Sequence, residues 1–215
     1  KGKKFDICFV VDPDADRLAL ISDKGEYLSE EFTQALAAYN YLEYKRGPVV
    51  TNLSSSMLMD FITRKFKVPL YRSSVGEANV VSLMKAKRAV IGGEGNGGVI
   101  WPDAHYGRDS LAGIFLILDL LSRKNIKLSE LIKDFPEYVI LKSKKYSETG
   151  YVDISRIKKE FPNCSIDERD GIKLIFEDSW IHIRASGTEP VIRVIAESLS
   201  LKKSKELITR IINLI

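Results

Sequence analysis

The hydrophobic and polar positions along the first two thirds of the chain predict alternating strands and helices. Short apolar runs are typical of buried strands, and apolar residues that recur every three or four positions indicate helices. Phe32, Leu36, Tyr39 and Leu42 follow the helical spacing and predict a helix from Glu30 to about Tyr44. The same pattern predicts strands at 5–11, 18–21, 49–53, 70–72, 89–91 and 99–100. It also predicts one helix directly after the serines 54–56 and further helices at 78–86, 111–121 and 128–135. This alternation predicts a mixed, mainly parallel three-layer α/β domain.

The pattern changes after Pro136. Strands are predicted at 164–167, 173–176, 180–184 and 191–197, with helices at 153–161 and from 200 to the end. The basic stretch 142–145 is expected to be a solvated strand or a linker. Short strands in succession with few helices predict a smaller α+β domain with an antiparallel sheet, covering residues 137–215.

Composition narrows the class of protein. A chain of 215 residues has room for one or two domains. Its net charge of +4, with both signs interspersed, suits small anionic substrates and is too weak to indicate nucleic acid. We expect no membrane span and a cytoplasmic location, with Cys8 and Cys164 as buried thiols in strands. Because the chain opens on Lys1 rather than Met, we expect it to be part of a longer protein.

An acidic loop follows the first strand. Asp12, Asp14 and Asp16 stand at alternate positions after the apolar run 7–11, and Arg17 follows them directly. Three carboxylates this close repel one another unless a cation lies among them, and hard oxygen ligands suit Mg²⁺, Mn²⁺ or Ca²⁺. Arg17 adds a bidentate donor of the kind that phosphate chemistry uses. The loop therefore predicts a divalent metal site beside a phosphate group.

The acidic loop has three other interpretations. A solvated acidic turn needs no ligand. A calcium-binding EF-hand is excluded because Arg17 and Asp23 occupy the places of its glycine and glutamate. An aspartyl-phosphate phosphatase, with Asp12 as nucleophile and Asp14 as acid, stays open, although a third aspartate favours a metal site over a covalent nucleophile.

A glycine-rich segment at 92–98 contains a formal G-x-G-x-x-G match. A dinucleotide site would need a helix to begin there, whereas residues 99–102 predict a strand and its end. The loop still carries Glu94 and Asn96, whose carboxylate and amide pair well with the hydroxyls of a sugar. We expect a hydroxyl-binding loop here, with a plain glycine-rich turn as the alternative.

A third loop, at 184–190, joins two strands of the second domain. Its small residues are typical of an anion-binding nest of backbone N–H groups. Ser186 and Thr188 add hydroxyls, and Arg184 and Arg193 add the fork geometry that fits phosphate. Together the three loops predict phosphoryl transfer on a phosphorylated sugar.

These three loops resemble those of the α-D-phosphohexomutase superfamily of phosphoglucomutases, phosphomannomutases and phosphoglucosamine mutases. The resemblance covers nearly the whole chain, with its metal loop at 12–17, its sugar loop at 93–98 and its phosphate loop at 184–190. The family metal loop usually reads Asp-Gly-Asp-Gly-Asp-Arg, so that Pro13 and Ala15 are variants here. The family sugar loop usually reads Gly-Glu-x-Ser-Gly-His, where this chain has other residues at 96 and 98.

The resemblance implies a function and a set of site residues. It implies Mg²⁺-dependent interconversion of hexose 1-phosphate and hexose 6-phosphate through a hexose 1,6-bisphosphate. It further implies that residues 1–26 end the second family domain, that 27–136 form the third and that 137–215 form the fourth. The implied metal ligands are Asp12, Asp14 and Asp16, with Arg17 in a supporting catalytic role. The implied substrate-binding residues are Glu94, Gly95, Asn96, Gly97, Gly98, Arg184, Ala185, Ser186, Gly187, Thr188 and Arg193.

The same resemblance implies that the phosphoserine domain is absent from this chain. We therefore expect a C-terminal fragment that is inactive alone and that takes the missing N-terminal domains of the same protein as its partner. A proton-transfer role for Glu77 is a further hypothesis. The alternatives are a module that binds sugar phosphates or metal without catalysis, and the phosphatase described above.

Overall fold

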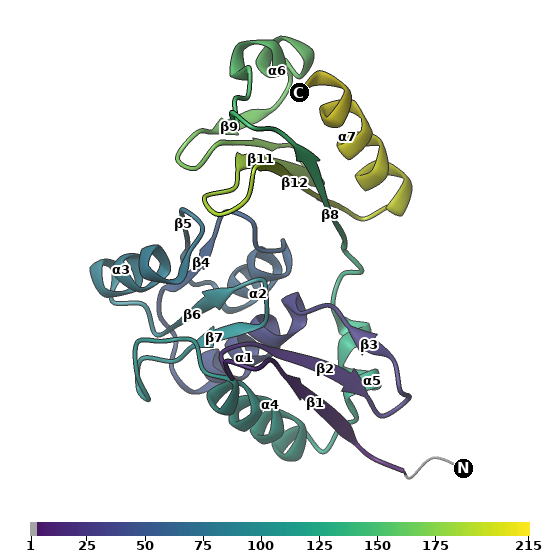
Figure 1. Ribbon diagram of the computed structural model, residues 1–215. Helices are drawn as coiled ribbons and strands as arrows, with labels where there is room; N and C mark the ends of the chain where they lie inside the picture. Colours follow the sequence, from purple (N-terminus) through teal and green to yellow (C-terminus); the bar gives the residue numbers. More distant parts are fainter. Residues whose placement is uncertain (1–3) are drawn as a thin grey trace. The chain divides into compact units, whose positions relative to one another are not determined.

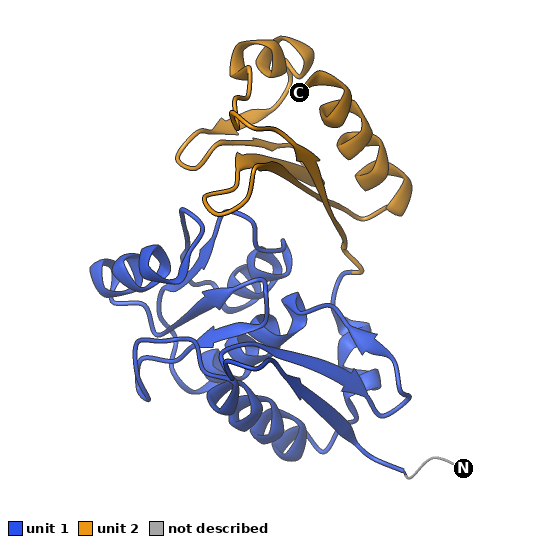
Figure 2. Cartoon of the chain, in the orientation of Figure 1, with its two compact units in different colours: residues 1–136 blue, residues 137–215 orange. Residues whose placement is uncertain are grey.

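The computed structural model describes residues 4–215 and divides the chain into two compact units, one ending at Pro136 and the other spanning Glu137–Ile215 (Figures 1 and 2). Unit 1 has two sheets and unit 2 has one, and each unit has its own helices. No helix within 4–215 is long and apolar enough to cross a membrane.

Unit 1 begins with an antiparallel sheet that carries the acidic loop. The order of its strands is β1-β2-β3, with Val11 opposite Leu18 across the loop. Strand β2 alternates buried and half-buried residues because one of its faces covers the core. Strand β1 is less covered, and Val10 and Val11 are 48% and 40% exposed. The strands span Ile7–Val11 (β1), Leu18–Ser22 (β2) and Tyr27–Leu28 (β3).

The second sheet of unit 1 has the order β5-β4-β6-β7, in which β5, β4 and β6 are parallel and β7 is antiparallel. Its strands are Val49–Asn52 (β4), Leu70–Ser73 (β5), Ile91–Glu94 (β6) and Gly98–Ile100 (β7). The helices of unit 1 are Glu31–Tyr44 (α1), Leu58–Phe66 (α2), Glu77–Lys87 (α3), Ser110–Lys124 (α4) and Leu128–Leu131 (α5), followed by a 3₁₀ helix at Ile132–Asp134.

Helix α1 lies at the centre of unit 1, where it contacts α2, α4 and the second sheet. Eleven of its fourteen residues are buried, so it has no polar face turned to solvent. The buried polar groups that result are paired: Thr33 Oγ1 donates to the Leu18 carbonyl at 2.6 Å, and Asn40 Nδ2 donates to Asp119 at 2.8 Å. Helix α1 thereby holds β2, and with it the acidic loop, against the α/β sheet.

Unit 2 is an antiparallel sheet covered by two helices. The order of its strands is β8-β12-β11-β10-β9. Helices α6 (Ile154–Glu160) and α7 (Leu201–Leu214) pack against it around a core of isoleucines, leucines and Phe161. The strands are Val139–Tyr146 (β8), Ser165–Asp167 (β9), Ile172–Ile175 (β10), Ser179–Ala185 (β11) and Val191–Ser198 (β12).

The predicted fold class is confirmed: a mixed, mainly parallel α/β domain precedes an antiparallel α+β domain. The basic stretch 142–145 is part of strand β8 rather than a linker. The prediction for the cysteines was wrong in detail, because both thiols are only half-buried and Cys164 lies just before β9. Desolvation of a thiolate, with no cation to offset it, raises the pKa of Cys164.

Candidate functional site

The acidic loop folds around Asp12. Its Oδ1 accepts hydrogen bonds from the backbone amides of Asp16 and Arg17, both at 3.2 Å. Desolvation acts in the opposite direction, but these hydrogen bonds and the Arg17 charge hold the pKa of Asp12 below its usual value. Ala15 has a left-handed backbone with φ of 57°, and its carbonyl accepts from Ser110 Oγ at 2.8 Å. The loop is therefore anchored both internally and to the start of α4.

Asp16 points toward the interior of unit 1, where it meets Arg108. The Arg108 guanidinium forms a close ion pair with Asp16 Oδ2. The other oxygen, Oδ1, is buried without a hydrogen-bond donor, and Arg17 Nε lies 3.6 Å from it. Burial and the neighbouring Asp12 charge raise the pKa of Asp16, although Arg108 and Arg17 oppose the shift. An orphaned carboxylate oxygen of this kind is open to a further positive group.

Glu94, at the end of β6, is held by three donors. Its Oε1 accepts from Asn52 Nδ2 at 2.8 Å and from the Gly76 amide at 3.1 Å. Its Oε2 accepts from Arg108 Nη1 at 3.1 Å. The side chain is 4% exposed, so the carboxylate has one fixed orientation. Since each oxygen has two lone pairs, Oε2 retains the capacity to accept one more hydrogen bond.

The glycines of the predicted sugar loop are required by close packing. A Cβ on Gly95 would lie 2.1 Å from a carboxylate oxygen of Glu31, and one on Gly97 would lie 2.4 Å from the Leu18 carbonyl oxygen. The Gly97 carbonyl also accepts from the Leu18 amide at 3.1 Å. Asn96 is half-buried, and its Oδ1 accepts from the Gly98 amide at 3.2 Å. Through Leu18 and Arg108, the loops 12–17 and 94–98 lie next to each other in unit 1.

The donors of this region suit Mg²⁺, but their arrangement does not. The donors are hard carboxylate oxygens, and Asp16 Oδ1 is buried without a hydrogen-bond partner, which suits the ion. The arrangement does not fit, because within residues 4–215 no three His, Cys, Asp or Glu side chains lie together in a way that could hold a metal. Asp14 is exposed, Asp12 binds its own loop, and Asp16 is paired with Arg108.

The predicted phosphate loop lies in unit 2, between β11 and β12. Arg184 and Arg193 are direct partners in the register of these strands. The loop is closed by the Ser186 amide, which donates to the Val191 carbonyl at 2.9 Å, and Arg193 pairs with Glu189 at 3.0 Å. A Cβ on residue 187 would touch nothing within 4 Å, so that packing does not require this glycine.

A cavity of about 350 Å³ adjoins this loop at Arg184 and Ala185. Arg184 Nε is buried without a hydrogen-bond partner, which leaves a cationic donor next to the cavity. The other lining residues are Gly150, Tyr151, Val152, Ile154, Asp170, Gly171, Ile172 and Ile183.

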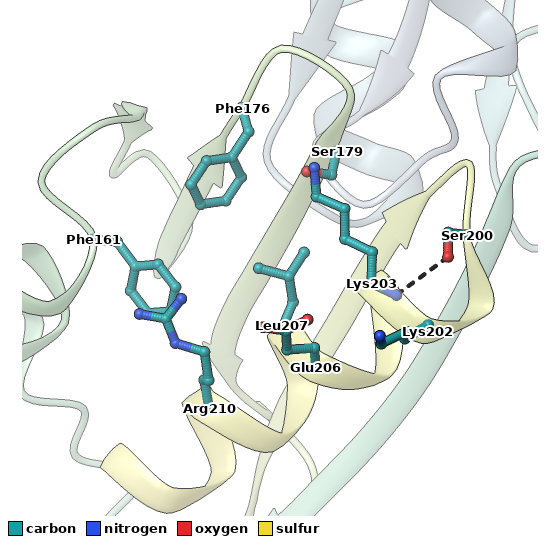
Figure 3. A pocket seen from close by; sticks show the side chains of 9 residues that line it. All are labelled: Phe161, Phe176, Ser179, Ser200, Lys202, Lys203, Glu206, Leu207 and Arg210. Carbon is teal, nitrogen blue, oxygen red and sulfur yellow. Dashed lines mark hydrogen bonds between the residues drawn. The ribbon is translucent and has the colours of Figure 1, made fainter.

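Another cavity of unit 2, of about 420 Å³, lies beside the first turns of α7 (Figure 3). Ser200 caps this helix by accepting from the Lys203 amide at 3.5 Å. Lys203 pairs with Asp178, and Arg210 pairs with Glu160 at 2.7 Å, so two of its three cations are matched within the protein. None of the predicted site residues lines this cavity, whose lining is Phe161, Phe176, Ser179, Ser200, Lys202, Lys203, Glu206, Leu207 and Arg210.

Sequence reasoning missed Arg108, Asn52 and Ser55. Ser55 Oγ accepts from the Gly95 amide at 3.0 Å, so this serine supports the sugar loop, whereas Ser56 Oγ accepts from the Leu58 amide at the start of α2. The one available signal for Arg108 was a charged residue in the short loop before α4. Its partners are distant in sequence, and only folding brings them together.

Comparison with known proteins identifies the family. Residues 30–138 match the model of phosphoglucomutase/phosphomannomutase alpha/beta/alpha domain III, and residues 125–214 match that of the phosphoglucomutase/phosphomannomutase C-terminal domain. The fold and these two matches define a protein of the α-D-phosphohexomutase superfamily. The chain belongs to the phosphoglucomutase/phosphomannomutase family, of which it carries domains III and IV.

Two relatives show how much of the family protein the chain covers. It is 37% identical over 199 residues to a phosphoglucomutase/phosphomannomutase of Thermococcus kodakarensis, covering 91% of this chain and 44% of that one. It is 34% identical over 214 residues to a phosphoglucosamine mutase of Methanocaldococcus jannaschii, covering 95% and 47%. The chain thus spans less than half the length of these relatives.

Solved structures share the fold. A phosphoglucomutase/phosphomannomutase family protein from Burkholderia thailandensis matches with a TM-score of 0.81 at 21% identity, over 94% of this chain and 44% of that one. The N-acetylphosphoglucosamine mutase of Aspergillus fumigatus, crystallised with GlcNAc-6P and magnesium, matches with a TM-score of 0.73 at 17% identity, over 100% and 49%.

Proposed function

We propose that this chain is the C-terminal part of a phosphohexomutase that interconverts hexose 1-phosphate and hexose 6-phosphate through a hexose 1,6-bisphosphate. The observation that carries the proposal is the close approach of the acidic loop and the Glu94 loop within unit 1, joined by Leu18 and Arg108. Carboxylates of the kind that a divalent cation uses in phosphoryl transfer and groups suited to sugar hydroxyls then lie side by side, which supports the proposal. Membership of the family supports the reaction class.

Each loop has a proposed role that follows from its chemistry. Glu94 accepts a sugar hydroxyl at the free capacity of Oε2, next to Asn96, in the segment 94–98. Residues 184–188 and Arg193 hold a phosphate, because Arg184 Nε is buried without a hydrogen-bond partner and the same loop carries the hydroxyls of Ser186 and Thr188. Arg17, half-exposed beside Asp12, neutralises charge on a second phosphate.

Mg²⁺ is the proposed cofactor. Asp12, Asp14 and Asp16 would hold it only if their carboxylates turned toward one another, because within residues 4–215 no three such side chains are arranged to hold a metal. When bound, the ion would supply charge stabilisation to the transferring phosphoryl group. The magnesium in the Aspergillus fumigatus relative supports this assignment.

The proposed partner is the N-terminal part of the same protein, which would supply the phosphoserine. The coverage of 44% and 47% of two relatives supports this. So does strand β1, which forms an edge of its sheet among the described residues and carries the exposed side chains of Val10 and Val11. An apolar edge strand of this kind is a template for pairing with another strand.

A mutase assay tests the proposal. The chain is incubated with glucose 1-phosphate, mannose 1-phosphate or glucosamine 1-phosphate, Mg²⁺ and a catalytic amount of the matching bisphosphate. We expect no turnover by the chain alone, and turnover when it is combined with the N-terminal half of the Thermococcus kodakarensis relative. Turnover by the chain alone would disprove the proposal that the phosphoserine must come from the N-terminal part of the protein.

The second candidate function is a module that binds sugar phosphates without catalysis. It is favoured by the same short coverage, since the loops for hydroxyls and phosphate are both present. Calorimetric binding of hexose phosphates by the chain, combined with no turnover in any mixture containing an N-terminal half, would favour this function over the mutase.

A further inference from the structure

The sheet of unit 2 has an outer face, which points away from α6 and α7 and gathers positive charge. Both helices pack on the other face, around a core that includes Ile181, Ile183 and Val194. Because side chains alternate along a strand, the neighbours of these core residues point to the outer face. The strand register places these cations there: Lys142 and Lys144 on β8, Arg193 on β12, Arg184 on β11 and Lys173 on β10. Folding thus brings together charges that are scattered along the sequence.

Three of these cations form one row across the sheet. Lys144 is the direct register partner of Arg193, and Arg193 is the direct partner of Arg184. Directly opposed residues of antiparallel strands have Cβ atoms about 4.5–5.5 Å apart, and like charges in such positions destabilise a sheet. The row is therefore unfavourable for the fold by itself, and an anion lying across it would relieve the repulsion.

Carboxylates of unit 2 offset the row only in part. Arg193 pairs with Glu189 at 3.0 Å, but both side chains are more than 40% exposed, so that this pair is weak. Arg184 Nε is buried without a hydrogen-bond partner. Lys144 is exposed, and within residues 4–215 no carboxylate pairs with it. The row thus keeps cationic donors that are available to a ligand.

The acidic strand residues of the outer face, Glu197 and Asp167, have other partners. Glu197 accepts from Trp180 Nε1 at 2.7 Å, and Asp167 pairs with Arg169 at 2.6 Å. Lys173 differs from the row in access, because it is 3% exposed and its Nζ lies 3.9 Å from the centre of the Trp180 ring. The ligand-accessible part of the outer face is therefore its basic part.

We propose that the row formed by Lys144, Arg193 and Arg184 binds a linear oligophosphate, either inorganic or the phosphate chain of a nucleotide. Adjacent strands lie about 4.8 Å apart, so the row extends over about 10 Å. Charges arranged in a line match a chain of phosphates better than they match one phosphate, and each contact is a charge-assisted hydrogen bond. Lys142, exposed on β8, adds charge beside the row. The inference rests on the proposed phosphate site at Arg184 and extends it to β8.

The shared residue Arg184 gives the row a regulatory role. An oligophosphate that spans the row occupies the guanidinium that is proposed to hold the sugar phosphate. The two ligands therefore exclude each other, and oligophosphate lowers the apparent affinity for hexose phosphate. Lys144 separates the two ligands, because it lies outside the loop 184–190 and contributes only to the longer anion.

The test is isothermal titration calorimetry of the whole chain with tripolyphosphate and with orthophosphate, in the absence of divalent cations. We expect tripolyphosphate to bind at least about tenfold more tightly, since each further charge-assisted hydrogen bond contributes at least about this factor. Lys144→Met should weaken tripolyphosphate binding at least about tenfold and leave orthophosphate binding unchanged. ATP should bind as tripolyphosphate does and lose affinity equally in Lys144→Met, because the phosphate chain is the part that is bound.

Two further variants separate the row from a general effect of charge. Lys205→Met removes an exposed charge from α7, on the other side of the sheet, and should change neither affinity. Glu189→Gln removes the carboxylate that pairs with Arg193 and should strengthen tripolyphosphate binding. A gain of affinity of this kind cannot result from loss of structure.

The outcomes distinguish this inference from the proposed phosphate site. Equal affinities for tripolyphosphate and orthophosphate in the unchanged chain, or equal losses in Lys144→Met and Lys205→Met, would overturn the row and leave the phosphate site in place. Tight binding of ATP that Lys144→Met does not weaken would show that the nucleoside is bound instead, and would overturn the row as well. Absence of binding of both inorganic anions would overturn the phosphate site and the row together.

Discussion

We expect unit 2 to lose stability when the pH falls below about 6.5, because of the buried side chain of His182. This residue is in the middle of β11, is 1% exposed, and its Nε2 lies 2.6 Å from the Asp170 carbonyl oxygen. Burial lowers the pKa of His182, and the charges of Lys173 and Arg184 lower it further, although the contact with Asp170 opposes them. The folded protein therefore takes up the proton at lower pH than the unfolded chain.

The sign and size of the effect follow from proton linkage. Between the folded-state pKa and the ordinary value of 6.5, the unfolded state binds more protons, so the free energy of unfolding decreases as the pH falls. The slope is at most about 1.4 kcal/mol per pH unit. From about pH 7.5 to about pH 5.5, His182 would lower the free energy of unfolding by up to about 1.4 kcal/mol, because the unfolded histidine is protonated over only the lower half of that range.

The assay uses urea unfolding followed by tryptophan fluorescence. The chain has two tryptophans, Trp101 in unit 1 and Trp180 in unit 2, so that Trp101→Phe leaves a probe of unit 2 alone. In this background, His182→Gln keeps an N–H that can donate to Asp170 but does not titrate. As the pH is lowered, we expect the free energy of unfolding to decrease more steeply when His182 is present than in the His182→Gln variant. Parallel pH profiles for the two proteins would show that the burial of His182 has no energetic consequence.

Three further predictions concern the loops and their supports. Gly97→Ala should destabilise unit 1 by more than about 2 kcal/mol in urea unfolding, because a left-handed backbone costs about 1–2 kcal/mol and the new Cβ would lie 2.4 Å from a carbonyl oxygen of β2. The control is Gly25→Ala, which also has positive φ but no atom within 4 Å of the new Cβ, so that it should lose only the free energy of the left-handed backbone. Arg184→Met should weaken the binding of inorganic phosphate at least about tenfold, the low end for charge-assisted hydrogen bonds, whereas Arg169→Met in the same unit should leave it unchanged in calorimetry. Asp109→Ala should destabilise unit 1 by about 1 kcal/mol in the same unfolding experiment, since Asp109 accepts from the Leu111 amide at 2.7 Å as the N-cap of α4, and an unchanged midpoint would contradict that role.

The order of the elements could be predicted because it depends on local patterns. The helix α1 was found from four apolar residues, although its burial on all sides removes the polar face that usually marks a helix. The strands on either side of the acidic loop were found because apolar runs there end at charged residues. The N-cap of α4, Asp109, is a local feature of the same kind, since capping is decided within a few residues.

The contacts within the candidate site could not be predicted, because they join distant segments. The partners of Arg108 come from the acidic loop, from the start of α3 and from the end of β6. No periodicity or motif relates these positions, and an arginine before a helix is ordinarily a solvated residue. The reverse holds for the phosphate loop, where both arginines flank one hairpin and their pairing follows from the strand register.

Glu94 shows how the two kinds of information combine. The glycine-rich sequence around it suggests a mobile carboxylate free to meet a sugar, but the side chain is 4% exposed and has three protein donors. A carboxylate that is already fixed loses little entropy when it accepts one more hydrogen bond, so its orientation is available to a ligand without reorganisation. One of its three donors, Arg108, also binds the acidic loop. The hydroxyl-binding loop and the acidic loop of unit 1 are therefore parts of one electrostatic network. A change of charge in either loop should alter the pairing of Arg108 with the other.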